Sequence, residues 1–410
     1  MGTGMRGFFL HICALAALGL ILNGCATRIG PAASAGANAQ SDAPKPGAVL
    51  VWNQPSPISQ DQLAQALASA RVVMVGETHD HPGHHEAQLN ILKLMIKQGP
   101  APVVGIEWLD HGAQPACDAL ASGSITVDEF AWLADWNNRW GYTLDLYRPI
   151  LEYVREHGLK LYALNAPLKV VRKVARQGLK SLTPQERATL APALNLEDPD
   201  YEEMVARQFQ GHGVMGKQAQ ANFLAAQIGR DETMAHNLAD ALHPWPDGGK
   251  KAVVLVGSAH LAHGRGLPPR IERRLPGVKL ITLLPVSSDK LKEAGQDIQD
   301  SEAPADYLIV TASAPPRPPR LGVMIRPAEG GLLVEGIWPG GAAFKAGVKK
   351  GDILKAVDGK TLNSPKDIHN VIKAAPYKPH QYLVIRDGKE LLLEITLADP
   401  NTARPRHPRE

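Results

Sequence analysis

The sequence predicts an α/β protein built on a mainly parallel sheet covered by helices, with a small β-rich domain after it. Two observations lead to this prediction. Between residues 71 and 311, short runs that are apolar at every position alternate with segments of helical periodicity, which is typical of strands buried on both faces of a sheet. Beyond residue 320, glycine-rich turns separate short strands of alternating polarity, which indicates a separate β domain.

Length and composition agree with this organisation and exclude some functions. At about 150 residues per domain, the 410 residues suit two or three domains. Charged residues make up 21% of the chain and the formal net charge is +3, which argues against nucleic acid as a partner and against a polybasic membrane surface. The three cysteines are too few for a disulfide-built fold or for a Cys-based zinc or iron–sulfur site.

The N-terminus predicts an export signal rather than part of the fold. Arg6 is the only charged side chain before an apolar run, Gly7–Leu22, which is short for a bilayer span and suits a signal peptide. The residues from Leu22 to Cys25 resemble the lipobox of bacterial lipoproteins. This resemblance implies that Cys25 is acylated and anchors the chain in the cell envelope, with Ala26 favouring the outer membrane. An ordinary secretory peptide is the alternative.

The expected elements follow in order along the chain. Strands are expected at the apolar runs Val72–Val75, Val103–Ile106, Lys160–Leu164, Lys251–Val256, Val278–Leu284 and Tyr307–Thr311. Helices are expected at Glu86–Gln98, Thr126–His157 and Lys217–Leu242. The resulting organisation is a signal peptide (1–25), a flexible tether (26–48), the α/β domain (49–312), a proline-rich linker (313–320), the β domain (321–398) and a disordered tail (399–410).

Polar residues follow the predicted strands at the points where the strands end. They are Glu77 and His79, Glu107, Asn165 and His260. Because the carboxyl ends of parallel strands share one edge of a sheet, these side chains are expected in one crevice. A buried carboxylate or imidazole without a partner costs several kcal/mol, so the groups must satisfy one another, a ligand or a metal. A self-contained polar network that caps the sheet is the alternative.

Histidines are concentrated just after the first of these strands. His79, His81, His84 and His85 lie within seven positions, a density that points to metal, haem or acid–base chemistry. The other interpretation is a solvated loop before a helix, and this is the one we expect for His81, which is next to a proline.

The ordered motifs of the α/β region resemble those of the ChaN-like haem-binding lipoproteins, between about Val49 and Val286. The matching residues are Gly76-Glu77-Thr78-His79-Asp80, His84-His85, Gly105-Ile106-Glu107, Tyr147-Arg148-Pro149-Ile150-Leu151, Ala163-Leu164-Asn165, Ala226 to Ala235 and Gly257-Ser258-Ala259-His260. The resemblance implies a surface lipoprotein that binds haem and takes part in iron uptake. It also implies a tyrosine ligand to the iron and a histidine from a second copy in a homodimer.

Five residues are the candidates for contacts with haem under this resemblance. Tyr147, in a motif-like stretch, is the candidate phenolate ligand, although a core tyrosine on a helix is the alternative. The others are His84, His85, Arg230 and Asp231, the last two as a charge-assisted pair or as a propionate contact. Trp132, Trp136 and Trp140 recur every four residues and are expected on one helical face, as a porphyrin wall, a partner surface or core.

An enzyme remains the alternative function at this stage. Glu77, His79, Glu107 and His260 are the candidate catalytic residues, and Glu77, His79 and His260 the candidate ligands of a divalent metal that activates water. Relatives in the wider Tiki superfamily are described as metal-dependent proteases or hydrolases. No Gly-x-Ser-x-Gly or His-Glu-x-x-His motif occurs, so an α/β-hydrolase or a zincin is not expected. His212, between two glycines, is a weaker candidate, and Cys117 is expected as a small buried residue.

The β-rich region resembles a PDZ domain of the bacterial HtrA-like type. The resemblance rests on Leu321-Gly322-Val323-Met324, Pro339 to Ala343, Ala346 to Leu354 and Val357-Asp358-Gly359. It implies that Leu321, Gly322 and Val323 present backbone N–H groups to the C-terminal carboxylate of a peptide or protein partner. A PDZ domain that only packs against the first domain is the alternative.

Overall fold

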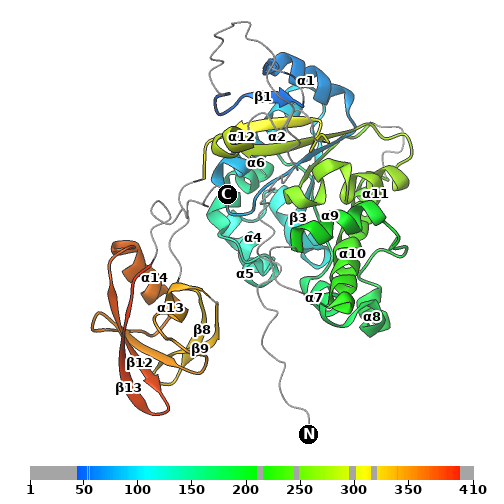
Figure 1. Ribbon diagram of the computed structural model, residues 1–410. Helices are drawn as coiled ribbons and strands as arrows, with labels where there is room; N and C mark the ends of the chain where they lie inside the picture. The colour runs from blue at the N-terminus through cyan, green and yellow to red at the C-terminus, as the bar shows by residue number, and fades with distance from the viewer. Residues whose placement is uncertain are drawn as a thin grey trace, which may run out of the picture. The chain divides into compact units, whose positions relative to one another are not determined.

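The computed structural model describes residues 44–52, 54, 56–209, 216–243, 249–294, 302–314, 321–338 and 340–397. Within these residues the chain forms two compact units, one ending at Ala314 and the other beginning at Leu321 (Figure 1). The predicted signal peptide, Cys25, His212, the C-terminal tail and most of the tether and linker lie outside the described residues. No described helix is long and apolar enough to cross a membrane.

The first unit is built on a seven-stranded sheet in the order β1-β7-β6-β2-β5-β3-β4. Its strands are β1 (Val49–Val51), β2 (Val72–Val75), β3 (Val103–Asp110), β4 (Leu161–Asn165), β5 (Ala252–Leu255), β6 (Leu280–Ser287) and β7 (Tyr307–Thr311). All neighbouring pairs are parallel except β1 and β7. The predicted mainly parallel sheet is therefore confirmed.

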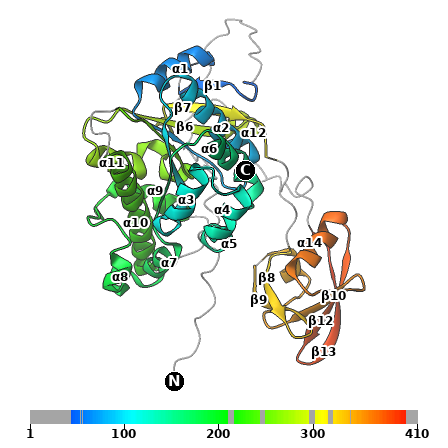
Figure 2. The same cartoon turned by 180° about the vertical axis from the view of Figure 1, so that it is seen from behind.

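Helices cover both faces of this sheet (Figures 1 and 2). They are α1 (Gln60–Ser69), α2 (Pro82–Lys97), α3 (Gln114–Ala121), α4 (Val127–Leu133), α5 (Trp136–Arg139), α6 (Leu144–Glu156), α7 (Leu168–Gln177), α8 (Pro184–Arg187), α9 (Pro199–Phe209), α10 (Lys217–Leu242), α11 (Leu267–Arg274) and α12 (Ser288–Ala294). The expected bounds of β2, β7 and α10 are confirmed to the residue.

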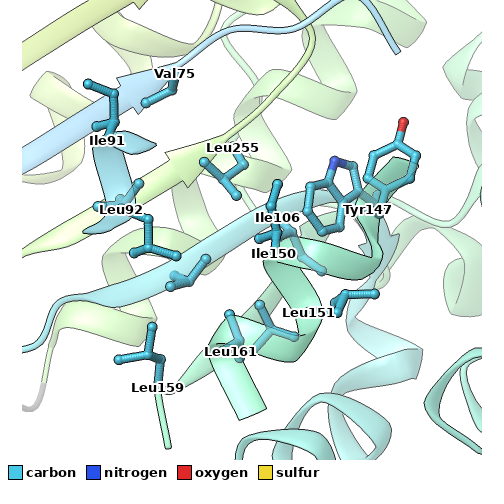
Figure 3. Close-up of a cluster of buried hydrophobic side chains, with 14 of the residues drawn as sticks. Val75, Ile91, Leu92, Ile106, Tyr147, Ile150, Leu151, Leu159, Leu161 and Leu255 are labelled. Atoms are coloured by element: carbon cyan, nitrogen blue, oxygen red, sulfur yellow. The ribbon is translucent and has the colours of Figure 1, made fainter. Parts of the chain in front are cut away.

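Two apolar cores form because successive residues of a strand point to opposite faces of the sheet. Val73 and Val75 of β2 pack with α2 and α6 in one core, which Figure 3 shows around Ile91, Ile106 and Ile150. Val72 and Met74 of the same strand pack in the other core with residues of α10 and α11. Burial on both faces explains why these strands are apolar at every position.

Strand β3 is longer than the sequence predicts. It runs on through Glu107 to Asp110 with every residue buried. Its regular pairing with β5 ends where Ile106 is paired with Leu255, and its pairing with β4 shifts register after Ile106. Glu107 therefore lies within the strand, but at the point where the regular ladder stops. Its side chain is buried and interacts with charged residues at the edge of the sheet.

The predicted helical face of Trp132, Trp136 and Trp140 is wrong, because the segment is not one helix. Helix α4 ends at Leu133, and Asp135 has a φ of +50°, a left-handed conformation that interrupts the helical repeat. Trp132 is 80% exposed while Trp136 is 2% exposed. The interruption thus turns the tryptophans in different directions.

The second unit is an antiparallel sheet in the order β13-β12-β10-β9-β8, with β11 paired to β10. Its elements are β8 (Val323–Ala328), β9 (Gly331–Ile337), α13 (Ala342–Lys345), β10 (Ile353–Val357), β11 (Lys360–Thr361), α14 (Pro365–Ala374), β12 (His380–Arg386) and β13 (Lys389–Ile395). Leu332, Val334, Leu354 and Val384 form its core with neighbouring apolar residues. Strand β8 is at an end of the sheet order.

Candidate functional site

Three adjacent strands bring carboxylates and histidines together at their carboxyl ends. Val75 of β2 and Ile106 of β3 are both paired with Leu255 of β5, so the residues that follow them are at one level. The side chains fall into two clusters. We name Glu77, His79, His85 and Tyr147 the Glu77 cluster, and Glu107, Arg230, Asp231 and His260 the Glu107 cluster.

Glu77 is a buried carboxylate shared by two imidazoles. Its Oε1 lies 2.7 Å from Nδ1 of His79, and its Oε2 lies 3.0 Å from Nδ1 of His85. Burial alone would raise the pKa of Glu77, but the charge of His85 and the hydrogen bonds from His79 and His85 outweigh it and lower this pKa to about 2. The group is therefore an anion at neutral pH.

The two histidines that bind Glu77 differ in how many of their ring nitrogens face an acceptor. Both ring nitrogens of His85 face acceptors, because Nε2 lies 3.1 Å from the carbonyl oxygen of His79. Burial opposes the charged form of His85, but Glu77 outweighs it and raises the pKa of this imidazole. His79 is bound to Glu77 through Nδ1 alone, and 17% of its side chain is exposed. His79 is thus the member of the cluster that reaches the surface.

Aromatic rings surround the exposed imidazole. The His79 ring lies 4.8 Å from the Trp140 ring, edge to face, and 5.0 Å from the Tyr142 ring. Trp140 and Tyr142 are half-buried and lie between the end of α5 and the start of α6. The loop between these helices therefore forms an aromatic wall beside His79.

Tyr147, the predicted phenolate ligand, lies beneath this wall. It is 0% exposed, and its hydroxyl donates to the carbonyl oxygen of His79 at 3.0 Å and to Oε1 of Glu77 at 3.4 Å. Figure 3 shows its ring at the border of the aliphatic core. Burial and then the negative charge of Glu77 raise the pKa of Tyr147 far above its usual range. This arrangement favours the core interpretation of Tyr147 and disfavours a phenolate there.

Glu107 is held by cationic and backbone donors. Its Oε1 accepts from Nη2 of Arg230 at 2.5 Å and lies 3.2 Å from Nε2 of His260, and its Oε2 accepts from the backbone N–H of Gly257. Burial opposes ionisation, but His260 and Arg230 outweigh it and hold the pKa of Glu107 well below its usual range. Asn165 donates to the Glu107 carbonyl oxygen at 2.8 Å and accepts from Arg230.

His260 is fixed between two carboxylates. Its Nδ1 lies 2.5 Å from Oδ1 of Asp231 and its Nε2 faces Glu107. Burial would lower the pKa of His260, but the two carboxylates raise it to about 9, so the ring is an imidazolium at neutral pH. Gly266, with a φ of +78°, allows this packing, because a Cβ there would lie 2.7 Å from the His260 carbonyl oxygen.

The two clusters meet at Gly257. A Cβ at this position would lie 2.8 Å from Cε1 of His79 and 3.3 Å from Oε2 of Glu107. Since carbon atoms do not approach so closely, only glycine leaves room for both side chains. The two histidine–carboxylate groups thus lie side by side at the carboxyl edge of the sheet, where the sequence predicts them.

Other predicted site residues lie apart from the exposed imidazole. His84 accepts a hydrogen bond at Nδ1 from the Thr78 N–H, 2.9 Å away, and stacks on His81 with 3.8 Å between ring centroids. His81 is buried, so the solvated position expected for it is wrong. Arg230 and Asp231 bind Glu107 and His260, respectively, and Asp231 is fully buried behind His260. Cys117 is buried in α3, as expected.

The predicted metal site of Glu77, His79 and His260 is not supported. Among the described residues, no three His, Cys, Asp or Glu side chains are placed to hold a metal ion. The physical reason is that His260 uses both ring nitrogens on carboxylates of the other cluster. A metal ligand needs a free nitrogen lone pair.

Sequence reasoning missed two features of the site. Tyr142 was not singled out, although a tyrosine just before a helix in the motif-rich region was a usable signal. Asp231 was expected beside Arg230 or a propionate rather than against His260. No local signal could have given that pairing, because the two residues are 29 positions apart and meet only when α10 packs on the sheet.

In the second unit, the residues predicted to bind a carboxylate form a fixed loop. Gly322 has a φ of +78°, and its carbonyl oxygen accepts from the Trp338 N–H at 2.8 Å. The Leu321 carbonyl oxygen accepts from the Ala343 N–H at 2.9 Å. The loop leads directly into β8, at the end of the sheet, where Val323 is half-buried.

Comparison with known proteins agrees with both folds. Residues 63–271 match the family model "Haem-binding uptake, Tiki superfamily, ChaN", and residues 319–397 match the PDZ domain. The structure is similar to that of ChaN from Campylobacter jejuni, which is described with cofacial haem binding. The two share 18% identity at a TM-score of 0.50, over 64% of this chain and 96% of that one. At this identity the likeness shows the fold.

Curated relatives are similar over part of their length only. RETICULATA-RELATED 5, a chloroplastic protein of Arabidopsis thaliana, is 26% identical over 291 residues, 65% of this chain and 37% of that protein. The periplasmic endoprotease DegQ of Escherichia coli is 38% identical over 68 residues, 16% of this chain and 15% of that protein. Because the ChaN model spans half of the 410 residues, the chain belongs to the ChaN family of haem-binding uptake proteins in the Tiki superfamily, with a PDZ domain.

Proposed function

We propose that this chain binds haem at the carboxyl edge of the seven-stranded sheet, with His79 as the side chain that reaches the iron. The observation that carries this proposal is that one ring nitrogen of His79 is hydrogen-bonded while the ring remains partly exposed. Its Nδ1 is bound to the buried anion Glu77, and its side chain is partly exposed between Trp140 and Tyr142.

The hydrogen bond to Glu77 prepares His79 as a ligand. A carboxylate anion can only accept, so Nδ1 of His79 carries the proton and Nε2 is the nitrogen left to bind a ligand. Carboxylates that accept from the second nitrogen of an imidazole fix its orientation and increase its basicity as a metal ligand. Haem supplies an iron that imidazole nitrogen ligates. The apolar rings beside His79 suit the faces of a porphyrin.

Haem titration tests this proposal directly. The protein would be residues 26–410, which include every described residue, and haemin would be added while the visible spectrum is recorded. We expect a saturable band that weakens or shifts in His79→Ala. His157→Ala is the matched control, because His157 is an exposed imidazole on the far end of α6. Unchanged spectra and affinity in His79→Ala would contradict ligation by His79, and no band in the wild type would contradict haem binding itself.

We further propose that acylation at Cys25 anchors the protein in the bacterial outer membrane, where it serves iron uptake. The lipobox-like Leu22-Asn23-Gly24-Cys25 sequence supports this. Mass spectrometry of the membrane-bound protein should find a lipid on residue 25, and Cys25→Ala should release the chain into the soluble fraction.

The role in iron uptake has its own test. A deletion strain should grow poorly when haem is its only iron source. Normal growth there would contradict the role in uptake.

The PDZ domain is proposed to dock the free C-terminus of a protein partner at Leu321, Gly322 and Val323. The fixed Gly322 loop and the β8 edge beside it support this, because an added strand can pair with a free sheet edge. Peptides with a free carboxylate should bind, and the same peptides with an amidated C-terminus should not.

We also propose that haem binding favours a homodimer, which sedimentation with and without haemin would test.

The metal-dependent hydrolase is the less favoured function. His260 uses both ring nitrogens, and Glu107 is occupied by Arg230, His260 and Gly257. In this network neither ring nitrogen of His260 is free to bind a metal ion.

A further inference from the structure

Helix α7 and its neighbours carry a concentration of positive charge that the low net charge of the chain conceals. Lys169, Arg172, Lys173, Arg176 and Lys180 follow one another between residues 168 and 187, and Glu186 is the only acidic residue in this stretch. Residues 217–229, the first half of α10, contain Lys217 and no acid. The whole chain has a net charge of only +3.

Four of the basic side chains share one face of α7. Lys169, Arg172, Lys173 and Arg176 recur at the three- and four-residue spacing that places side chains on one side of a helix. Lys180 follows in the short 3-10 helix Leu179–Ser181, beyond Gly178 at the end of α7. The opposite side of α7, with Val170, Val171 and Val174, is buried against α10. The basic side is therefore turned to solvent, and Lys169, Arg176 and Lys180 are exposed.

Lys217 extends this face beyond α7. Gly178, at the end of α7, packs against Asn222 of α10, one turn and a half from exposed Lys217. Figures 1 and 2 show α7, α8 and one end of α10 together at the same end of the first unit. We name Lys169, Arg172, Arg176, Lys180 and Lys217 the basic face.

The charges of the basic face are not used within the structure. Lys173 pairs with Glu186 at 2.6 Å, but among the described residues the five members of the basic face form no ion pair. Like charges so close together repel each other and are unfavourable without a counter-charge. The arrangement therefore fits an anionic partner.

The surface chemistry points to the kind of partner. The large exposed apolar side chains are Trp132, Leu133, Leu196, Trp338, Phe344 and Leu392, and none of them belongs to α7, α8 or α10. Protein interfaces usually centre on aromatic or aliphatic anchors, and single-stranded nucleic acid is bound on aromatic rings. A basic face without such anchors suits a layer of anionic lipid headgroups, which attracts Lys and Arg by charge alone.

We infer that the basic face binds the anionic phospholipid headgroups of a membrane. This would add an electrostatic contact to the proposed acyl anchor, since stable membrane attachment generally uses two signals. It would also orient the first unit on the bilayer with the α7 end toward the lipid. The inference does not depend on acylation, because the charges are part of the folded domain.

Vesicle binding of the unacylated protein tests the inference. Residues 26–410 would be sedimented with vesicles of phosphatidylcholine alone or with one-third phosphatidylglycerol. We expect binding only to the anionic vesicles, weakened at least about tenfold by the triple variant Lys169→Glu, Arg176→Glu, Lys180→Glu, and weakened by added salt. Lys360→Glu, Lys373→Glu, Lys378→Glu is the matched control, because it changes the net charge equally at exposed positions of the other unit.

The outcomes separate this inference from the other proposals. No binding of the wild type to anionic vesicles, or an equal loss in the control variant, would overturn it. Binding to duplex DNA but not to vesicles, lost in the same triple variant, would show a nucleic-acid face instead. Circular dichroism would establish that both variants are folded. The test protein, residues 26–410, contains neither Cys25 nor its lipid. Finding Cys25 unacylated in cells would therefore contradict the proposed anchor without affecting the vesicle result.

Discussion

The Glu77 and Glu107 clusters both join a buried glutamate to histidine at the same edge of the sheet, but their histidines are held differently. His260 lies between two carboxylates, with both ring nitrogens occupied. His79 is held by one carboxylate at one nitrogen and is partly exposed. The number of buried acceptors around each ring decides whether it remains a cation within the fold or can bind a ligand. One cluster is thus built for stability and the other for binding.

The largest effect should come from breaking the Glu107 cluster. In Glu107→Gln, Arg230 and His260 lose the buried carboxylate that they share, and loss of one partner of a buried ion pair costs about 3 to 5 kcal/mol. We expect a loss of this size in the free energy of unfolding, measured with urea. A loss below about 1 kcal/mol, the usual size for an exposed pair, would contradict the structural role of the cluster.

The pH dependence of stability should separate the two clusters next. The pKa of His260 rises from 6.5 to about 9 on folding, so the folded protein binds more protons than the unfolded chain within this range. The stabilisation is complete below about pH 6.5 and is lost as the pH rises toward 9. Urea unfolding at several pH values should show this decline in the wild type and a smaller one in His260→Gln. The same slope in both would contradict the assignment.

At low pH the carboxylate of the Glu77 cluster should contribute to the pH dependence of stability. Because folding lowers the pKa of Glu77 from 4.5 to about 2, its contribution is present above about pH 4.5 and is lost as the pH falls toward 2. In Glu77→Gln, the decline of the unfolding free energy over this range should be shallower. An equally steep decline in Glu77→Gln would contradict this contribution.

A smaller stability effect, but a clear change in binding, is expected at His79. His79→Ala removes a partly exposed side chain and one charge-assisted hydrogen bond, which is worth about 1.5 to 3 kcal/mol before relaxation and exposure reduce it. Its haem affinity should fall by about tenfold or more, because the iron would lose the imidazole ligand that Glu77 orients. Strong destabilisation with unchanged haem affinity would reverse the roles of the two clusters.

The smallest effect is expected at Tyr147. Tyr147→Phe removes the hydroxyl that donates to His79 and Glu77 but keeps the buried ring, so the free energy of unfolding should fall by about 1 kcal/mol. The haem spectrum should keep its band if His79 is the ligand. Loss of the band would instead support the phenolate that the family resemblance implies.

Several parts of this structure could be predicted from local patterns. The strands Val72–Val75 and Tyr307–Thr311 have the expected bounds, because burial in the sheet leaves continuous apolar runs. The helix Lys217–Leu242 has the expected bounds as well. Strand β1 was missed, since three residues at a sheet edge carry too little pattern. The break at Asp135 was missed as well, because the four-residue spacing of the tryptophans in the sequence is the same with or without a break. The left-handed residue changes only the directions in which their side chains point.

The sequence by itself determined the two folds, the sheet edge where the polar residues gather, and their identities. Strand ends and apolar periodicity are local properties, and parallel strands share an edge whatever their order. Only the tertiary structure decided which carboxylate holds which histidine, that Tyr147 is buried, and that scattered cations form one face. These depend on contacts between residues far apart in the chain. Burial also shifts the pKa values of side chains, and these shifts cannot be derived from the amino-acid composition.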